Sequence, residues 1–310
     1  MMATAPGRVF IHEVAVRDGF QSEPSFVPTA GKISLIDRLA RTGLARIEAT
    51  SFVSPKAVPN LRDAEEVMRG IERVPGVVYA ALVPNVRGAG RALAAAVDEL
   101  NLVMSASESH NQANMRMSCD ASLEQFAAVL ALPRDARVQV CGTVATAFGC
   151  PFEGDVPLAR VLWAADRYLA LGMHGVTLAD TTGMADPRQV FDVARAFGSA
   201  FPGVPLTLHF HNTRNMGFAN VLAALDAGVT RFDASLGGIG GCPFAPGATG
   251  NICTEDLVHM LHSMGVETGV DLDRLLAVAR DLPALLGHDV PGQVIKAGKR
   301  TDLHPRPALR

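Results

Sequence analysis

The 310-residue sequence has few aromatic residues, few charges and no long apolar run. Aromatic side chains make up 5%, with one Trp and two Tyr, which disfavours the aromatic platforms that bind carbohydrates or single-stranded nucleic acids. No stretch approaches the roughly 20 consecutive apolar residues that span a bilayer, so a membrane-spanning role is excluded. Lys and Arg (28) are outnumbered by Asp and Glu (31), and no basic block offers a surface for nucleic acid.

The sequence also lacks the cysteine spacings of metal and redox motifs. Its five cysteines form no CxxC pair, and an odd count of this kind favours free thiols. They are Cys119, Cys141, Cys150, Cys242 and Cys253. The first ten residues show no basic segment followed by an apolar stretch, as a secretory signal would, so we expect a protein of the reducing cytoplasm.

Hydrophobic residues make up 48% of the chain, and short apolar runs alternate with longer segments of helical period. We expect strands at residues 9–18, 45–52, 77–84, 99–107, 137–145, 175–182, 205–212 and 231–238. We expect helices between them at residues 28–42, 61–73, 86–97, 122–132, 157–171, 187–200 and 214–227. Gly43, Gly172 and Gly228 stand between a helix and the next strand, where glycine adopts the left-handed conformation.

Eight βα units predict a closed (β/α)8 TIM barrel. An open doubly wound sheet would show a GxGxxG turn after its first strand, and residues 17–21 read RDGFQ instead. Such barrels use roughly 250 residues, so we expect one catalytic domain over residues 1–310. It would comprise the barrel (9–238), a glycine-rich active-site loop (237–251), additional helices (254–290) beside the barrel or over its mouth, and a solvated basic tail (296–310).

In TIM barrels the chemistry takes place at the C-terminal ends of the strands. His209 and His211 alternate on the seventh strand, so both imidazoles project to the same side. With the carboxylate of Asp18 they favour a divalent metal site that accepts Mg²⁺, Mn²⁺, Co²⁺ or Zn²⁺. The alternative for Asp18 is that it caps the following helix.

Arg17 and Cys242 are further catalytic candidates. A guanidinium at the end of the first strand can stabilise a developing oxyanion. The alternative for Arg17 is an ion pair with Glu48 or Asp180, which is compatible with that role because a carboxylate would orient the guanidinium. Cys242 is the only thiol in the glycine-rich loop, where backbone amides can lower its pKa and let it donate or accept a proton.

Several long motifs occur together in residues 13–21 (EVAVRDGFQ), 47–56 (IEATSFVSPK), 149–154 (GCPFEG) and 240–251 (GGCPFAPGATGN). In these motifs, and from about residue 9 to about residue 285, the chain resembles 3-hydroxy-3-methylglutaryl-CoA lyase, a family of the DRE-TIM metallolyases. The resemblance implies a Mg²⁺ or Mn²⁺ ion, an acyl-CoA substrate and a place in leucine degradation. It places the metal ligands at Asp18, His209, His211 and Asn251, the catalytic arginine at Arg17 and the loop cysteine at Cys242. It places substrate-site residues at Gln21, Glu48, Asp180 and Glu255.

Three residues depart from the family pattern near the expected acyl and CoA sites. Asn212 and Arg214 stand where the family has Asp and Tyr, and Ala113 stands where it tends to have a basic residue. We expect the metal and the chemistry to be kept, whereas the acyl group of the substrate stays open.

The working hypothesis is a retro-Claisen cleavage in which the metal binds the substrate's tertiary hydroxyl and distal carboxylate. Asp18, His209 or Cys242 removes the hydroxyl proton, Arg17 stabilises the thioester enolate, and Cys242 delivers or relays a proton. The products would be acetyl-CoA and acetoacetate. The alternatives are cleavage of a related substrate such as citramalyl-CoA, and a condensing synthase, which is disfavoured because only about 60 residues follow Asn251. A non-catalytic ligand-binding barrel is the least favoured. Because such barrels commonly associate, we expect a homo-oligomer of undetermined size.

Overall fold

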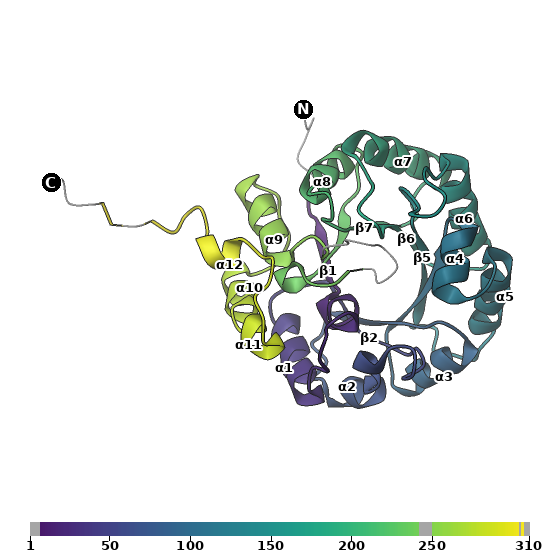
Figure 1. Ribbon diagram of the computed structural model, residues 1–310, viewed down its shortest axis with the longest axis horizontal. Helices are drawn as coiled ribbons and strands as arrows, with labels where there is room; N and C mark the ends of the chain where they lie inside the picture. The colour runs from purple at the N-terminus through teal and green to yellow at the C-terminus, as the bar shows by residue number, and fades with distance from the viewer. Residues whose placement is uncertain (1–6, 242–249, 304, 307–310) are drawn as a thin grey trace.

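The computed structural model describes residues 7–241, 250–303 and 305–306. Within them, eight parallel strands pair in chain order, and β8 pairs with β1 to close a barrel. Figure 1 shows the strands as an inner ring with the helices arranged around it. The strands are β1 (Phe10–Glu13), β2 (Arg46–Ser51), β3 (Val78–Leu82), β4 (Glu99–Ser105), β5 (Gln139–Ala145), β6 (Gly175–Asp180), β7 (Leu206–Phe210) and β8 (Arg231–Ala234). The prediction of a (β/α)8 TIM barrel is therefore confirmed.

The helices match the predicted segments with three differences. They are α1 (Thr29–Ala40), α2 (Ala64–Gly70), α3 (Val86–Ala94), α4 (Glu108–Met115), α5 (Cys119–Leu130), α6 (Leu158–Ala170), α7 (Pro187–Ala200), α8 (Gly217–Asp226), α9 (Thr254–Ser263), α10 (Leu272–Ala279), α11 (Leu282–Leu286) and α12 (Val294–Ala297). Helices α4 and α12 were not expected, since α4 is mostly polar and α12 has four residues. Within the region of additional helices expected over 254–290, α10 and α11 are separate, because Pro283 cannot donate a backbone hydrogen bond and stands in the first turn of α11.

The barrel lumen is polar, whereas the outward faces of the strands are apolar. In β4, for example, Leu100 and Leu102 belong to the apolar core between strands and helices. The alternate residues Glu99 and Asn101 are buried polar side chains that bond to groups on other strands. Because a buried charge is costly unless it is paired, these lumen residues hold one another in fixed positions.

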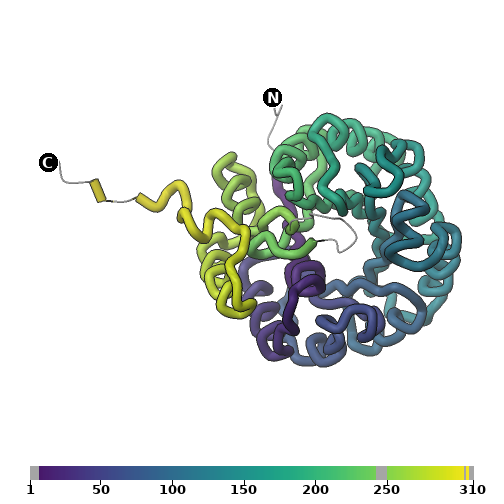
Figure 2. Tube along the Cα trace, in the orientation of Figure 1, coloured from purple at the N-terminus to yellow at the C-terminus, as the bar shows by residue number. Residues whose placement is uncertain are grey.

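Helices α9 to α12 lie together beside the barrel, next to α1 (Figures 1 and 2). The segment between α9 and α10 packs closely against the barrel at Gly43, where a Cβ would lie 2.1 Å from the Gly269 carbonyl oxygen. Gly43 has a φ of 93°, and Gly172 and Gly228 have φ of 90° and 94°, as expected at helix ends. In the part of the chain that the structure describes, no helix combines the length and apolar character needed to cross a membrane.

Candidate active site

A π-helical turn, Ala15–Gly19, follows β1 and carries Arg17 and Asp18. The strand expected over 9–18 is therefore shorter, and the two residues lie on the turn. The amide of its last residue donates to Val14 O at 3.4 Å, five residues back, which is the wide ring that defines a π-turn. Gly19, the last residue of the turn, has no room for a side chain, because a Cβ would lie 2.6 Å from the Ile239 side chain. Turns of this kind are frequent at functional sites.

Arg17 is fixed by two carboxylates in the barrel lumen. Its Nε donates to Glu48 Oε2 at 2.5 Å, and its Nη1 donates to Asp18 Oδ1. Glu48 in turn accepts a bond from Asn101 Nδ2 at 2.8 Å, and Asn101 Oδ1 accepts from Thr143 Oγ1 at 2.8 Å. Burial alone would lower the pKa of the guanidinium, but the charges of Glu48 and Asp18 raise it, so Arg17 stays charged.

Asp18, His209 and His211 form a cluster that can hold a metal ion. One ligand atom from each lies within 4.8 Å of the others. His209 lies on β7 and His211 directly after it, and their Nε2 atoms are 3.1 Å apart. Ligands in neighbouring positions of an octahedral ion are about 3 Å apart when each lies about 2.1 Å from the metal. The two imidazoles are therefore spaced as neighbouring ligands would be.

Asn251 reaches this cluster through a β-bridge to His211. Its Nδ2 donates to Asp18 Oδ2 at 2.7 Å and to Ile239 O at 3.0 Å. Both partners are acceptors, which assigns the nitrogen to that side of the amide. The Oδ1 atom is consequently buried without a hydrogen-bond partner among the described residues. An orphaned oxygen beside a carboxylate and two imidazoles fits a divalent cation.

The Asp18 carboxyl is ionised at neutral pH. Burial alone would raise its pKa, but Arg17, followed by His209 and His211, lowers the pKa to about 2. Asp18 is thus suited to be a charged ligand and is a weak base.

Asp180 ends β6 and holds the loop that leads to α7. Its Oδ1 accepts from the amides of Met184 at 2.7 Å and Ala185 at 3.1 Å. Its Oδ2 is buried without a hydrogen-bond partner among the described residues. Burial raises the pKa of this carboxyl to about 6 against the opposing amide bonds. Asp180 therefore combines an anchoring atom with a second oxygen that is available to a ligand.

Glu255 lies under the start of the glycine-rich loop and outside the metal cluster. Both of its carboxylate oxygens accept from the amide of Gly237, at 3.1 and 3.2 Å. Glu13, which the sequence reasoning did not select as a site residue, bonds to the amide of Leu236 at 2.9 Å and to Thr254 Oγ1 at 2.8 Å. Burial raises the pKa of each carboxyl to about 7. The strand expected over 9–18 placed Glu13 in its interior, and only the structure shows that β1 ends at this residue.

Two predicted residues stand apart from these contacts. Gln21 lies two residues after the π-turn and is half-buried. Cys242 lies outside the described residues. The four cysteines within them are free thiols, as predicted: Cys119, Cys141, Cys150 and Cys253.

Two of the three residues that depart from the family pattern make structural contacts at the barrel mouth. Asn212 Oδ1 accepts from the Gly217 amide at 3.1 Å, at the start of α8. Arg214 Nη1 donates to Thr182 O at 3.0 Å and Gly183 O at 2.9 Å, which ties the loop after β7 to the loop after β6. Ala113 lies within α4.

Comparisons with known proteins agree with this geometry. The family model described as HMGL-like matches residues 8–282. Hydroxymethylglutaryl-CoA lyase YngG of Bacillus subtilis is 44% identical over 294 residues, which cover 95% of this chain and 98% of that protein. The (R)-citramalyl-CoA lyase of Chloroflexus aurantiacus is 43% identical over 300 residues, which cover 94% of this chain and 95% of that protein.

Among solved structures, an HMG-CoA lyase from Acinetobacter baumannii, in complex with coenzyme A and 3-methylmalate, superposes with a TM-score of 0.94. It is 55% identical, and the match covers 97% of this chain and 98% of that one. The lyases match nearly the whole chain and share its barrel. The chain therefore belongs to the hydroxymethylglutaryl-CoA lyase family of enzymes.

Proposed function

We propose that the chain cleaves a carbon–carbon bond in 3-hydroxy-3-methylglutaryl-CoA and releases acetyl-CoA and acetoacetate. The observation that carries the proposal is the convergence of Asp18, His209 and His211 at the barrel mouth, with Arg17 bonded to Asp18. This arrangement, in a chain 44% identical to a lyase of this name, joins a metal-binding cluster to a donor for an oxyanion. A cytoplasmic location and a role in leucine degradation belong to the same proposal.

The residues that would hold the cation are Asp18, His209, His211 and Asn251. When bound, a divalent ion supplies Lewis-acid chemistry that lowers the pKa of a coordinated hydroxyl. Asp18 and Asn251 offer oxygen ligands, and this set of four contains no thiolate. Such a set suits Mg²⁺ or Mn²⁺, which the family resemblance also favours.

Arg17 would stabilise the charge that develops on the thioester oxygen. Its Nε–H donates to Glu48 and one Nη1 hydrogen to Asp18, so the second Nη1 hydrogen and the Nη2 group can donate to substrate. As the bond between the second and third carbons breaks, the hydroxyl oxygen becomes the ketone of acetoacetate and the bonding pair passes to the enolate of acetyl-CoA. A donor fixed before the reaction lowers the energy of that enolate.

Two proton transfers complete the reaction. The hydroxyl proton goes to one of the three candidate bases, Asp18, His209 or Cys242. The low pKa of Asp18 makes it the weakest of them. The enolate carbon then takes a proton from the Cys242 thiol. Glu255 would support this step by holding the amide of Gly237, where the glycine-rich loop begins. Gln21 and Asp180 are proposed to contact the substrate.

Citramalyl-CoA is the second candidate substrate. It shares the tertiary 3-hydroxyl and the thioester with 3-hydroxy-3-methylglutaryl-CoA, and its carboxylate is one methylene closer to the hydroxyl. The (R)-citramalyl-CoA lyase at 43% identity favours this possibility. Arg214 adds a cation to the loop after β7, tied to the Thr182 carbonyl, and we propose that it distinguishes the two substrates by the reach of their carboxylates.

The test is incubation of the protein with Mg²⁺ or Mn²⁺ and a panel of 3-hydroxyacyl-CoA thioesters that includes both candidates, with products identified by mass. We expect acetyl-CoA and acetoacetate from the first candidate and none from a chelator-treated sample. Cleavage of citramalyl-CoA alone would replace the substrate assignment, and cleavage of no thioester would overturn the proposed function. Light scattering on the same sample tests the predicted homo-oligomer.

A further inference from the structure

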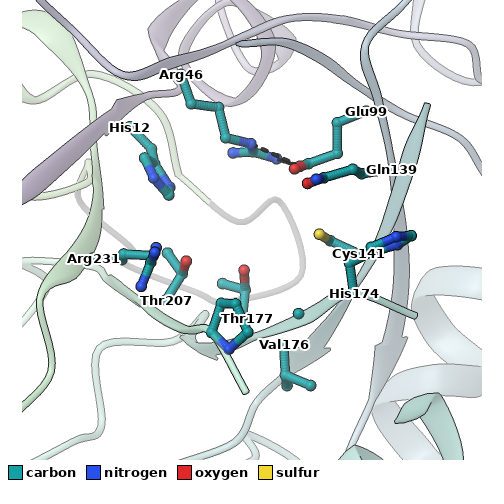
Figure 3. A pocket seen from close by; sticks show the side chains of 12 residues that line it. His12, Arg46, Glu99, Gln139, Cys141, His174, Val176, Thr177, Thr207 and Arg231 are labelled. Carbon is teal, nitrogen blue, oxygen red and sulfur yellow. Dashed lines mark hydrogen bonds and ion pairs between the residues drawn. The ribbon is translucent and has the colours of Figure 1, made fainter. Parts of the chain in front are cut away.

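The opposite end of the barrel contains a second group of buried polar residues. A cavity of about 320 Å³ opens there, at the N-terminal ends of the strands, and its wall includes His12, Arg46, Glu99 and Arg231. Figure 3 shows the ion pair of Arg46 with Glu99 on one side of this cavity, with His12 beside it. Arg46, Glu99 and Arg231 are the first residues of their strands, so the cavity is the floor of the barrel and the metal cluster is at its mouth.

Asp233 connects this floor to the metal cluster. It is the third residue of β8, and the register of the barrel places it beside His12 on β1 and beside His209 on β7. Its Oδ1 lies 3.3 Å from His12 Nδ1 and 3.8 Å from Arg46 Nη1. Its Oδ2 lies 3.2 Å from His209 Nδ1. One buried carboxylate thus contacts a floor histidine, a floor arginine and a predicted metal ligand.

The contact with His209 determines which ring nitrogen can bind a metal. A neutral imidazole has one N–H group and one lone pair, and a carboxylate can only accept a hydrogen bond. The hydrogen therefore resides on Nδ1, toward Asp233. The lone pair is left on Nε2, which faces His211 Nε2 at 3.1 Å. Carboxylates in this position orient a histidine ligand and raise its basicity.

We propose that Asp233 is a positioning residue for His209: its Oδ2 faces the ring Nδ1 of His209, and its Oδ1 contacts His12 on the barrel floor. This inference rests on the proposed function in so far as it assumes that His209 binds the cation. It assigns a role to a buried carboxylate whose other oxygen faces His12 and Arg46 on the barrel floor. Asp233 acts through His209 and makes no contact with the reacting atoms.

The experiment compares Asp233→Asn with the control Glu99→Gln, and measures Mn²⁺ binding by calorimetry without any substrate. Asparagine keeps the size of the side chain but loses its charge, so we expect Mn²⁺ affinity to fall by about 10- to 100-fold. Glu99→Gln breaks the same floor network without touching His209, and we expect its affinity within about twofold of wild type. Equal losses in both variants, or an unchanged affinity in Asp233→Asn, would overturn the proposal.

A second measurement uses the wild-type protein, so it remains possible if Asp233→Asn fails to fold. Nitrogen-15 NMR of histidine-labelled, Mg²⁺-loaded wild-type protein reports which nitrogen of each ring carries hydrogen, and His209→Asn identifies the His209 signal. We expect hydrogen on Nδ1 and none on Nε2, and the reverse would overturn the proposal. Neither measurement involves an acyl-CoA, so a protein that binds Mn²⁺ as described but cleaves no thioester disproves the proposed function alone.

Discussion

Replacement of Arg17 by methionine separates the catalytic use of this residue from its structural use. Methionine keeps much of the buried volume but removes the donors to Glu48, to Asp18 and to the substrate oxygen. Loss of one preorganised oxyanion donor lowers kcat by about 10²- to 10³-fold, or about 3–4 kcal/mol of transition-state stabilisation. The change also strands the Glu48 carboxylate, which is 1% exposed. Breaking a buried pair in this way costs about 3–5 kcal/mol of folding stability.

The double variant Arg17→Met with Glu48→Gln tells the two effects apart. Glutamine is neutral and can still accept the hydrogen bond from Asn101, so most of the lost stability should return. The kcat should stay as low as in the single variant, because the donor is still absent. Urea unfolding and steady-state turnover at saturating Mn²⁺ measure the two quantities. A kcat for Arg17→Met within tenfold of wild type would refute the oxyanion role.

Three further predictions concern the loop, a buried acid and the barrel mouth. Cys242→Ala should lower kcat by about 10²- to 10⁴-fold if the thiol transfers a proton. The control Cys119→Ala, in α5, should leave kcat unchanged. Similar turnover in both variants would remove Cys242 from the mechanism. Burial raises the pKa of Glu255 from 4.5 to about 7. Between these values the carboxyl is ionised in the unfolded chain but protonated in the folded one, so the free energy of unfolding of the wild type falls as pH rises. Glu255→Gln should therefore lose less stability between pH 5 and pH 8 in urea titrations, and an equal loss would contradict the assigned burial. Arg214→Tyr should change the ratio of kcat/KM for 3-hydroxy-3-methylglutaryl-CoA and citramalyl-CoA, and an unchanged ratio would show that Arg214 only ties two loops together.

The sequence was sufficient for the barrel because eight apolar strand segments alternate with helical ones. It also placed His209 and His211 on one face, because alternate strand residues share a direction. It could not bring Asn251 to Asp18 from residue patterns, since 233 positions separate them and only the family resemblance joined them.

Asp233 was missed for a different physical reason. The strand expected over 231–238 placed Asp233 in its first half, away from the C-terminal end where catalytic residues are expected, whereas β8 ends one residue after Asp233. Its importance depends on register with β1 and β7, which is a property of the closed barrel. Helix α4 was missed because its sequence, ESHNQANM, lacks the apolar periodicity by which helices are recognised.

The π-turn after β1 makes the spacing of this site intolerant of changes in chain length. Along a strand, neighbouring side chains point to opposite faces, yet the turn lets Arg17 and Asp18 serve the same lumen. Deleting one residue from Ala15–Gly19 would convert the wide ring to an ordinary α-helical one and rotate the side chains beyond it by about 100°. Asp18 would then leave the two histidines although no site residue had been replaced. We expect sequences that keep this chemistry to vary at Ala15 and Val16 but not in the number of residues in the turn.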